Sequence, residues 1–480
     1  MGIPDVCGES RTHLFPSKLR GLSHARPKRM VKEMQELKSK ASFGNPNRAW
    51  RQKEIPITSF NCFATFETMD RVAALCKEAG FTALEFQRRD EKEIACAVEA
   101  CRKHGLQYML DDFRWFGAFQ DSRMAPWTQE TLAKAADVYA NDPAFFGYYV
   151  WDEPFPGQFP LARQVTDELE RIDPAHIPYS VALPSYQDRY TWPNEKYESY
   201  LREYTEVIQP PVLSLDYYPF FFEARNPGEL DRGNLYNDLG LLRKLSLETN
   251  TPFWFYFQCW RHRSNLESPP MTGEMVRFQF YNVLLHGGRG MQWFIIFDNI
   301  VTRDGRKGYQ FELAKELNAE CKALENVLLG LTSRAVYYGN AIPRPGQEDQ
   351  NALLGLRPED DLARPGQYDS SEPVNSRFGD DIRLDPIFSA VPCGITIGRF
   401  DDGYGHDYAM IQNRDFEAFA DIALPLRAPK RLVEISRRDG RITVLAQSAN
   451  HIRMELRPGD AVLLRLDDPD SPCEEIRYLY

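Results

Sequence analysis

Between residues 55 and 330, short runs of β-branched and aromatic residues alternate with longer amphipathic stretches. This alternation is typical of repeated βα units, in which a helix follows each strand of a parallel sheet. Predicted strands occupy residues 55–63, 81–87, 106–113, 145–153, 177–185, 212–220, 252–260 and 290–299. Amphipathic patterns that end in Gly or Asn, as helix C-caps do, include residues 69–80, 91–105, 235–250 and 310–330.

Eight such units predict a (β/α)8 TIM barrel over residues 51–333, because about 250 residues are typical of this fold. A doubly wound open sheet is the alternative interpretation. It would carry a GxGxxG turn after its first strand, and the chain has no such turn there. The pattern therefore favours the barrel.

The pattern changes after residue 335. A polar stretch with several Pro and Gly residues is followed by short alternating runs without helices between them. This predicts a small antiparallel β-sandwich domain over residues 334–480. Within it, the run MELRPGDAVLLRL (454–466) predicts a hairpin with Pro-Gly-Asp in its turn. Residues 1–50 are basic and lack both periodicity and an apolar signal core, so they predict a poorly ordered N-terminal tail.

Composition and charge narrow the class of partner. The 480 residues carry a formal net charge of -11, which argues against nucleic acid because binding phosphates requires a basic surface. No apolar run reaches the roughly 18 residues of a membrane span. The nine cysteines are scattered without zinc-site spacing, as expected of reduced thiols in a cytoplasmic protein. Whether the chain forms a homo-oligomer is left open.

The carboxyl ends of the predicted strands define the candidate site, since catalytic groups of TIM barrels lie there. These ends are rich in carboxylates, amides and aromatic rings, and histidine is sparse. The pattern predicts no catalytic metal and no organic cofactor, because metal hydrolysis usually needs several His and carboxylate ligands. The residues at these ends are Asp111, Asp112, Trp151, Asp152, Glu153, Asp216, Tyr217, Tyr218, Gln258, Trp260, Arg261, His262, Trp293, Asp298 and Asn299.

This set of residues fits glycoside hydrolysis. The reaction needs one carboxylic acid to protonate the leaving oxygen and a second carboxylate as nucleophile or base. Aromatic faces suit the apolar face of a sugar ring. Glu153 is the predicted acid, because Tyr149, Trp151 and Phe155 surround it in the sequence and would raise its pKa.

The segment GYYVWDEP (147–154) resembles the fourth-strand motif of clan-A-type glycoside hydrolases, especially β-galactosidase-like barrels with a trailing β-sandwich. VLSLDYYPF (212–220) resembles their sixth-strand segment. TNTPFWFYFQCW, followed by GEMVRFQFYNVLLHGGRGMQWFIIF, is similar to their last two barrel units. The resemblance implies that Glu153 is the general acid/base and that Asp152 bonds a sugar hydroxyl beside the scissile bond.

The chain departs from that family at the seventh strand, where the nucleophilic Glu is replaced by Gln258. Asp216 is the first candidate for the second carboxylate, because it ends an apolar strand and precedes two tyrosines. Asp112, Glu85 and Asp298 are the next candidates.

Sugar contacts are predicted at several of the strand ends and in the loop after the third strand. One of Asp111 and Asp112 is expected to line the pocket. About half of Trp151, Trp260 and Trp293 are expected to touch ligand, since buried aromatic residues also pack barrel cores. The predicted substrate-binding residues are Asp152, Asp112, Trp151, Tyr218, Gln258, Trp260, Trp293 and Trp115.

Two other functions remain open. Gln258, at the nucleophile position, would suit a carbohydrate-binding protein without hydrolytic activity. Arg261 and His262 would suit a lyase or isomerase that acts on a sugar acid.

Overall fold

The computed structural model describes residues 48–471, apart from 61, 63, 89, 115–126, 186–196, 223–234, 261–270 and 341–378. All described residues belong to one compact unit, Ala41–Tyr480. The predicted tail therefore lies almost wholly outside the described residues, and the limits 1–50, 51–333 and 334–480 stay predictions. Among the described residues, no helix has the length and apolar character needed to cross a membrane.

The eight predicted barrel strands are confirmed, each shorter than the sequence pattern suggested. They form two parallel four-stranded sheets, in the orders β2-β3-β4-β5 and β1-β8-β7-β6. Their bounds are β1 (Ile57–Ser59), β2 (Ala83–Arg88), β3 (Gln107–Asp112), β4 (Phe145–Asp152), β5 (Ile177–Val181), β6 (Leu213–Tyr217), β7 (Phe253–Gln258) and β8 (Gly290–Phe294).

Backbone hydrogen bonds join the two sheets at both seams. Next to β5 and β6, the Ala182 N–H donates to the Ser214 carbonyl oxygen at 2.8 Å. Between β1 and β2, the Thr82 N–H donates to the Ile57 oxygen at 2.9 Å, and the Cys62 N–H donates to that of Glu85 at 2.7 Å. The strands therefore close into a barrel, and the predicted (β/α)8 fold is confirmed.

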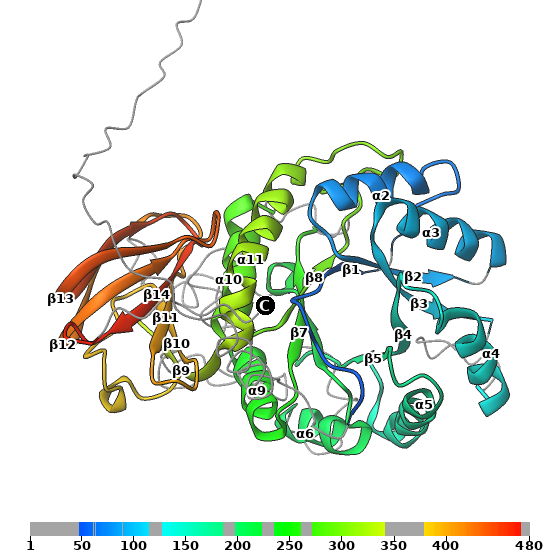
Figure 1. Cartoon of the computed structure of the whole chain (residues 1–480), viewed down its shortest axis with the longest axis horizontal. Coiled ribbons are helices and arrows are strands. Elements are labelled where there is room, and N and C mark those ends of the chain that lie inside the picture. The colour runs from blue at the N-terminus through cyan, green and yellow to red at the C-terminus, as the bar shows by residue number, and fades with distance from the viewer. Residues whose placement is uncertain are drawn as a thin grey trace, which may run out of the picture. The chain divides into compact units, whose positions relative to one another are not determined.

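Helices surround the strands (Figure 1). A C-cap predicted from sequence is present: Gly105 ends its helix at φ 64°, and at the start of the same helix Asp90 accepts hydrogen bonds from the backbone N–H groups of Lys92 and Glu93. The helices are α2 (Met69–Glu78), α3 (Glu91–His104), α4 (Gln129–Tyr139), η1 (Pro156–Gln158), α5 (Phe159–Ile172), α6 (Tyr197–Ile208), α7 (Pro219–Phe222), α9 (Leu235–Thr249), α10 (Gly273–Leu285) and α11 (Phe311–Gly330).

The predicted β domain is confirmed as a six-stranded antiparallel sheet in the order β13-β12-β14-β11-β10-β9. The two longest strands, β12 and β13, each span two of the short runs predicted from sequence. They pair with each other, with register shifts along β12. The strands are β9 (Thr332–Tyr338), β10 (Ile395–Asp401), β11 (Asp407–Asn413), β12 (Ala420–Ile435), β13 (Ile442–Leu456) and β14 (Ala461–Asp467), with η4 (Ile382–Leu384) before β10.

The hairpin predicted at residues 454–466 is wrong. β12 lies between β13 and β14 and pairs with both of them. The Pro-Gly-Asp segment is therefore a crossover, in which Gly459 adopts φ 69° and its N–H donates to the Asp415 oxygen at 2.8 Å. The sequence correctly indicates a turn at Pro-Gly-Asp, but it does not indicate which strand pairs with β13 or with β14.

One face of this sheet packs against the barrel helices, and an apolar cluster fills the opposite face. On the barrel side, the Gln412 Nε2 group donates to the Phe278 carbonyl oxygen of α10 at 2.7 Å. The Phe278 and Phe416 rings lie 5.8 Å apart. On the opposite face, residues from the first half of β12 pack over β10, β11 and β14, as expected of a second sandwich layer. The cluster includes Ile397, Ile411, Leu424 and Leu466.

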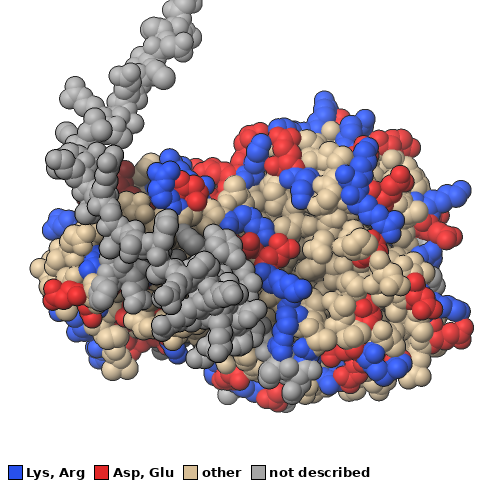
Figure 2. All heavy atoms as spheres, viewed as in Figure 1, with Lys and Arg blue, Asp and Glu red and all other residues tan. Residues whose placement is uncertain are grey.

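A buried ion network also joins α10, α11 and the sheet. Arg277 lies 3.2 Å from Glu320 and 3.6 Å from Asp460, and Arg437 contacts the same two carboxylates. On the face shown in Figure 2, exposed basic and acidic side chains are interspersed. Because Arg277, Arg437 and Arg457 all pair with Asp460, this carboxylate is the centre of the network.

Replacing Asp460 should destabilise the protein far more than replacing a nearby exposed carboxylate. Asp460→Asn removes the buried carboxylate that three arginines share and leaves their charge only partly balanced by Glu320, so the free energy of unfolding should fall by about 3 kcal/mol. Asp439→Asn removes an exposed partner of Arg441 and should cost about 1 kcal/mol at most. Urea unfolding of both variants would measure this difference, and equal losses would contradict the role given to Asp460.

Candidate active site

The middle of the barrel is polar, although branched apolar side chains usually fill this layer. Glu85 of β2 accepts a hydrogen bond from the Thr58 hydroxyl at 2.6 Å and one from the Gln292 amide at 3.3 Å. The Tyr256 hydroxyl donates to its other carboxyl oxygen. Gln292 in turn donates to the Tyr179 hydroxyl at 2.8 Å. This layer therefore surrounds one buried carboxyl group with donors from three different strands, β1, β7 and β8.

Three further carboxyl groups lie at the carboxyl ends of β4 and β6. Asp152 ends β4 and accepts a hydrogen bond from the Tyr149 hydroxyl at 2.9 Å. Asp216, near the end of β6, is hydrogen-bonded by the Tyr218 hydroxyl and is in hydrogen-bonding contact with the carboxyl group of Glu153. The structure therefore brings together the two predicted catalytic residues, Glu153 and Asp216.

Burial changes the acidity of these groups. Desolvation raises the pKa of Glu85 to about 7, and the charge of Asp152 adds to this effect. Desolvation likewise raises the pKa of Asp152 to about 7. The pKa of Asp216 also rises to about 7, first through desolvation and then through the charge of Asp152, against hydrogen bonds from Tyr218 and Glu153 that favour its ionised form. The carboxyl groups at this end of the barrel, its mouth, therefore retain protons up to neutral pH.

The backbone around Glu153 is strained. Glu153 adopts φ 50°, in the left-handed region, while its N–H still donates to the Val181 oxygen of β5 at 3.0 Å. A non-glycine residue held there costs on the order of 1 kcal/mol or more, and such strain clusters at functional sites. The Tyr200 hydroxyl of α6 fixes the next residue by donating to the Pro154 oxygen at 2.9 Å.

Of the two aspartates at the end of β3, one already binds protein side chains. Asp112 is fully buried, and its carboxylate is bound by Arg114 at 2.7 Å and by the Tyr139 hydroxyl at 2.7 Å. Met109 belongs to the apolar cluster inside the barrel, so Asp111, two residues further along β3, shares the inward face. Asp111 is therefore the member of this pair that can line the mouth.

The three tryptophans predicted at strand ends differ in their surroundings. Trp293 is fully buried and donates its indole N–H to Asn318 of α11 at 3.0 Å. Trp151 belongs to the apolar core between strands and helices. Trp260 is only partly buried, and its ring lies 6.4 Å from that of Phe294. Of these three, Trp260 is the ring best placed to meet a ligand. Trp115 lies outside the described residues.

The remaining candidates have distinct surroundings. Gln258 is buried, and its amide oxygen accepts a hydrogen bond from the Phe220 N–H at 2.9 Å. Asp298 is exposed and lies 3.9 Å from Arg303, so it is an unsuitable second carboxylate. Arg261 and His262 lie outside the described residues. Among the described residues, no cluster of His, Cys, Asp and Glu could hold a metal ion.

Sequence reasoning missed the tyrosines that support the carboxyl groups. Tyr200 contacts the chain on both sides of the site, because its hydroxyl also accepts a hydrogen bond from the Leu183 N–H at 3.0 Å. Its signal was the helical spacing of Tyr197, Tyr200 and Tyr204 in α6, whose neighbouring rings stack. Tyr256 carried a weaker signal, since its inward position follows only from strand register.

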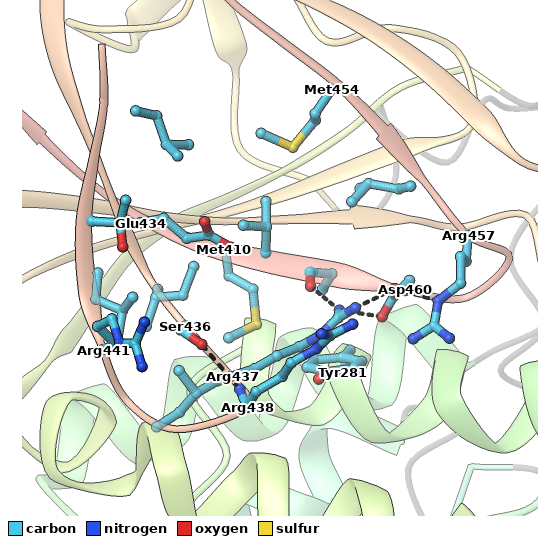
Figure 3. Close-up of a pocket in the computed structure, with 18 of the residues that line it drawn as sticks. Tyr281, Met410, Glu434, Ser436, Arg437, Arg438, Arg441, Met454, Arg457 and Asp460 are labelled. Atoms are coloured by element: carbon cyan, nitrogen blue, oxygen red, sulfur yellow. Dashed lines mark hydrogen bonds and ion pairs between the residues drawn. The ribbon is translucent and has the colours of Figure 1, made fainter. Parts of the chain in front are cut away.

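A cavity of about 670 Å³ lies elsewhere, against the antiparallel sheet (Figure 3). It is lined by β12, β13 and β14 together with Tyr281 of α10 and Leu324 of α11. Two of its arginines, Arg437 and Arg457, pair with Asp460 and so have little charge left for a ligand. The carboxyl groups of the barrel mouth do not line this cavity.

Comparison with known proteins gives structural matches only. No protein-family profile and no curated protein matches the chain. It is similar to a glycoside hydrolase family 5 structure from Bacteroides vulgatus, with 10% identity, a TM-score of 0.49, and coverage of 91% of this chain and 96% of that one.

Two further matches are to named enzymes. The endo-β-1,4-mannanase from Thermotoga petrophila is 10% identical, with a TM-score of 0.40 and coverage of 76% of this chain and 96% of that one. A GH2 β-galacturonidase from Eisenbergiella tayi is 13% identical, with a TM-score of 0.40 and coverage of 56% of this chain and 51% of that one. At these identities, the residues of this chain decide what its site can do.

Glu85→Gln should flatten the dependence of stability on pH. Unfolded glutamate releases its proton near pH 4.3, whereas folded Glu85 holds it up to about pH 7. The folded protein binds the extra proton, so its free energy of unfolding falls as pH rises between these values. From pH 5 to pH 8, the wild type should lose roughly 2 to 3 kcal/mol more than the variant, by urea unfolding.

The control is Glu99→Gln, at an exposed position on α3. Its pH dependence should match that of the wild type. Equal slopes for the wild type and Glu85→Gln would show that Glu85 is ionised in the folded protein.

Proposed function

We propose that the protein is a glycoside hydrolase in which Glu153 is the general acid and Asp216 the second carboxylate. The observation that carries this proposal is the contact between their carboxyl groups at the ends of two barrel strands. The desolvation of Asp216 and the strained backbone of Glu153 support it. The substrate would be an oligosaccharide or a small glycoside.

The pair can supply the proton that the reaction needs. Two carboxyl groups in contact cannot both ionise easily, so they share one proton and titrate as a unit. With that proton on Glu153, Asp216 is ionised, which is the state that hydrolysis requires. Glu153 then protonates the leaving oxygen as its bond to the sugar breaks, and Asp216 acts as nucleophile or as base toward water.

The substrate must separate the two carboxyl groups. Retaining enzymes place them about 5–5.5 Å apart and inverting enzymes about 6.5–9.5 Å apart, both beyond hydrogen-bonding distance. The contact between Glu153 and Asp216 is therefore a resting state, which the glycosidic oxygen interrupts on binding. The product anomer reveals which of the two separations is reached.

Neighbouring side chains would form the sugar subsite. Asp152 can accept a sugar hydroxyl in addition to the Tyr149 hydroxyl, because a carboxylate accepts several hydrogen bonds. Asp111 is inward-facing, and Trp260 and Tyr218 contribute aromatic surface beside Phe294. Carbohydrate binding without hydrolysis is the second candidate, motivated by Gln258 at the seventh-strand position.

Glu153→Gln should abolish hydrolysis of substrates with poor leaving groups. Without the acid, kcat should fall by about 10³-fold on an oligosaccharide, but far less on an aryl glycoside whose leaving group needs no protonation. Asp216→Asn should lose activity on both substrates. Proton NMR on a panel of short oligosaccharides and aryl glycosides measures both the rates and the first-formed anomer.

Glu455→Gln, at an exposed position on β13, is the control and should retain the wild-type rate. Broadened ligand signals without any cleavage by the wild type would favour the binding protein instead. If Glu153→Gln cleaves as fast as the wild type, Glu153 is not the acid.

A further inference from the structure

The end of β7 is tied to the ends of both neighbouring strands. The Gln258 amide oxygen accepts a hydrogen bond from the Phe220 N–H at 2.9 Å, just after β6, and its amide nitrogen donates to the Trp260 oxygen at 2.9 Å. The next residue, Cys259, places its sulfur 3.0 Å from the Phe294 oxygen and 3.3 Å from the Ile295 oxygen, at the end of β8. The side chains of Gln258 and Cys259 therefore both form hydrogen bonds with backbone groups.

The segment held by Cys259 is strained. Ile295 adopts φ 38°, which is rare for a β-branched residue and persists only where surrounding contacts enforce it. Cys259 is fully buried, and desolvation raises the pKa of its thiol, which therefore stays protonated as a donor. The thiol is one of the contacts that hold this turn.

The two segments held by β7 carry rings that stack on each other. Tyr218 lies two residues before Phe220, and its ring packs on that of Phe294 with centroids 4.1 Å apart and planes tilted by 25°. The Tyr218 hydroxyl hydrogen-bonds Asp216. The position of this hydroxyl therefore depends on both tethered segments.

We propose that Gln258 and Cys259 are positioning residues, which fix Tyr218 and through it orient Asp216 toward Glu153. Gln258, at the end of the seventh strand, then helps to hold Asp216, the proposed second carboxylate, at the end of the sixth strand. The kinetic consequence rests on the proposed hydrolase function, whereas the effect on Asp216 itself does not.

The titration of Asp216 is the direct measure of this positioning. The groups that act on it are Asp152 and Glu153 at the end of β4, Tyr218 after β6, and Tyr200 of α6. The Tyr218 hydrogen bond favours the ionised form of Asp216, so its loss should raise the pKa of Asp216. A change confined to packing elsewhere would leave this value in place.

The test compares Cys259→Ala and Cys259→Ser with Cys321→Ala, a matched change at a fully buried cysteine of α11. Carbon-13 NMR of proteins labelled at aspartate carboxyl groups, with Asp216→Asn to assign the signal, follows the titration. Cys259→Ala should raise the Asp216 pKa by about half a unit or more and lower kcat about tenfold, with KM within twofold. Cys259→Ser should restore both values, because a hydroxyl can donate its one hydrogen to these carbonyl groups in place of the thiol.

Cys321→Ala should leave the Asp216 titration and kcat unchanged, although it lowers the melting temperature. An unchanged Asp216 pKa in Cys259→Ala would overturn the positioning role, whether or not the protein hydrolyses glycosides. A shifted pKa in a protein that cleaves no glycoside would support the positioning role and reject the hydrolase.

Discussion

The desolvation of carboxyl groups inside the closed barrel is the constraint on which the candidate site depends. Parallel strands end at one rim, so acidic residues at the ends of β4 and β6 must lie near each other once the barrel closes. Taken out of water, these groups cannot all ionise, and the chain keeps protons on them up to about pH 7. The acid chemistry of the mouth follows from the geometry of closure.

The polar layer below the mouth makes this arrangement tolerable. A buried Glu85 without donors would destabilise the fold by several kcal/mol, whereas Thr58, Tyr256 and Gln292 each give it a hydrogen bond. The same donors restrict where Glu85 can move. The barrel thus combines a rigid polar centre with a rim at which, under the proposed function, the carboxyl groups of Glu153 and Asp216 separate when a substrate binds.

The barrel was readable from sequence because periodicity, caps and strand-end chemistry all depend on local pattern. Glu153 and Asp216 could be chosen because each follows an apolar strand, and the fold brings such ends together. Strand register and pairing are not local, which is why Asp112 was preferred to Asp111 and why β13 was paired with β14. The tyrosines around the carboxyl groups were missed for the same reason, since aromatic residues in strands and helices look alike whether they pack or donate.

The antiparallel sheet reaches the barrel mouth through three consecutive residues of α10. Arg277 joins the ion network with Asp460, and Phe278 accepts the Gln412 hydrogen bond from the sheet. Gln279 binds both backbone groups of Gln258, accepting from its N–H at 3.0 Å and donating to its oxygen at 2.8 Å. A displacement of the sheet would therefore move the end of β7, which β5 and β6 separate from the strand that precedes Glu153. The sheet contributes to the site by fixing the helix that holds this strand, so the trailing domain and the barrel form one mechanical unit.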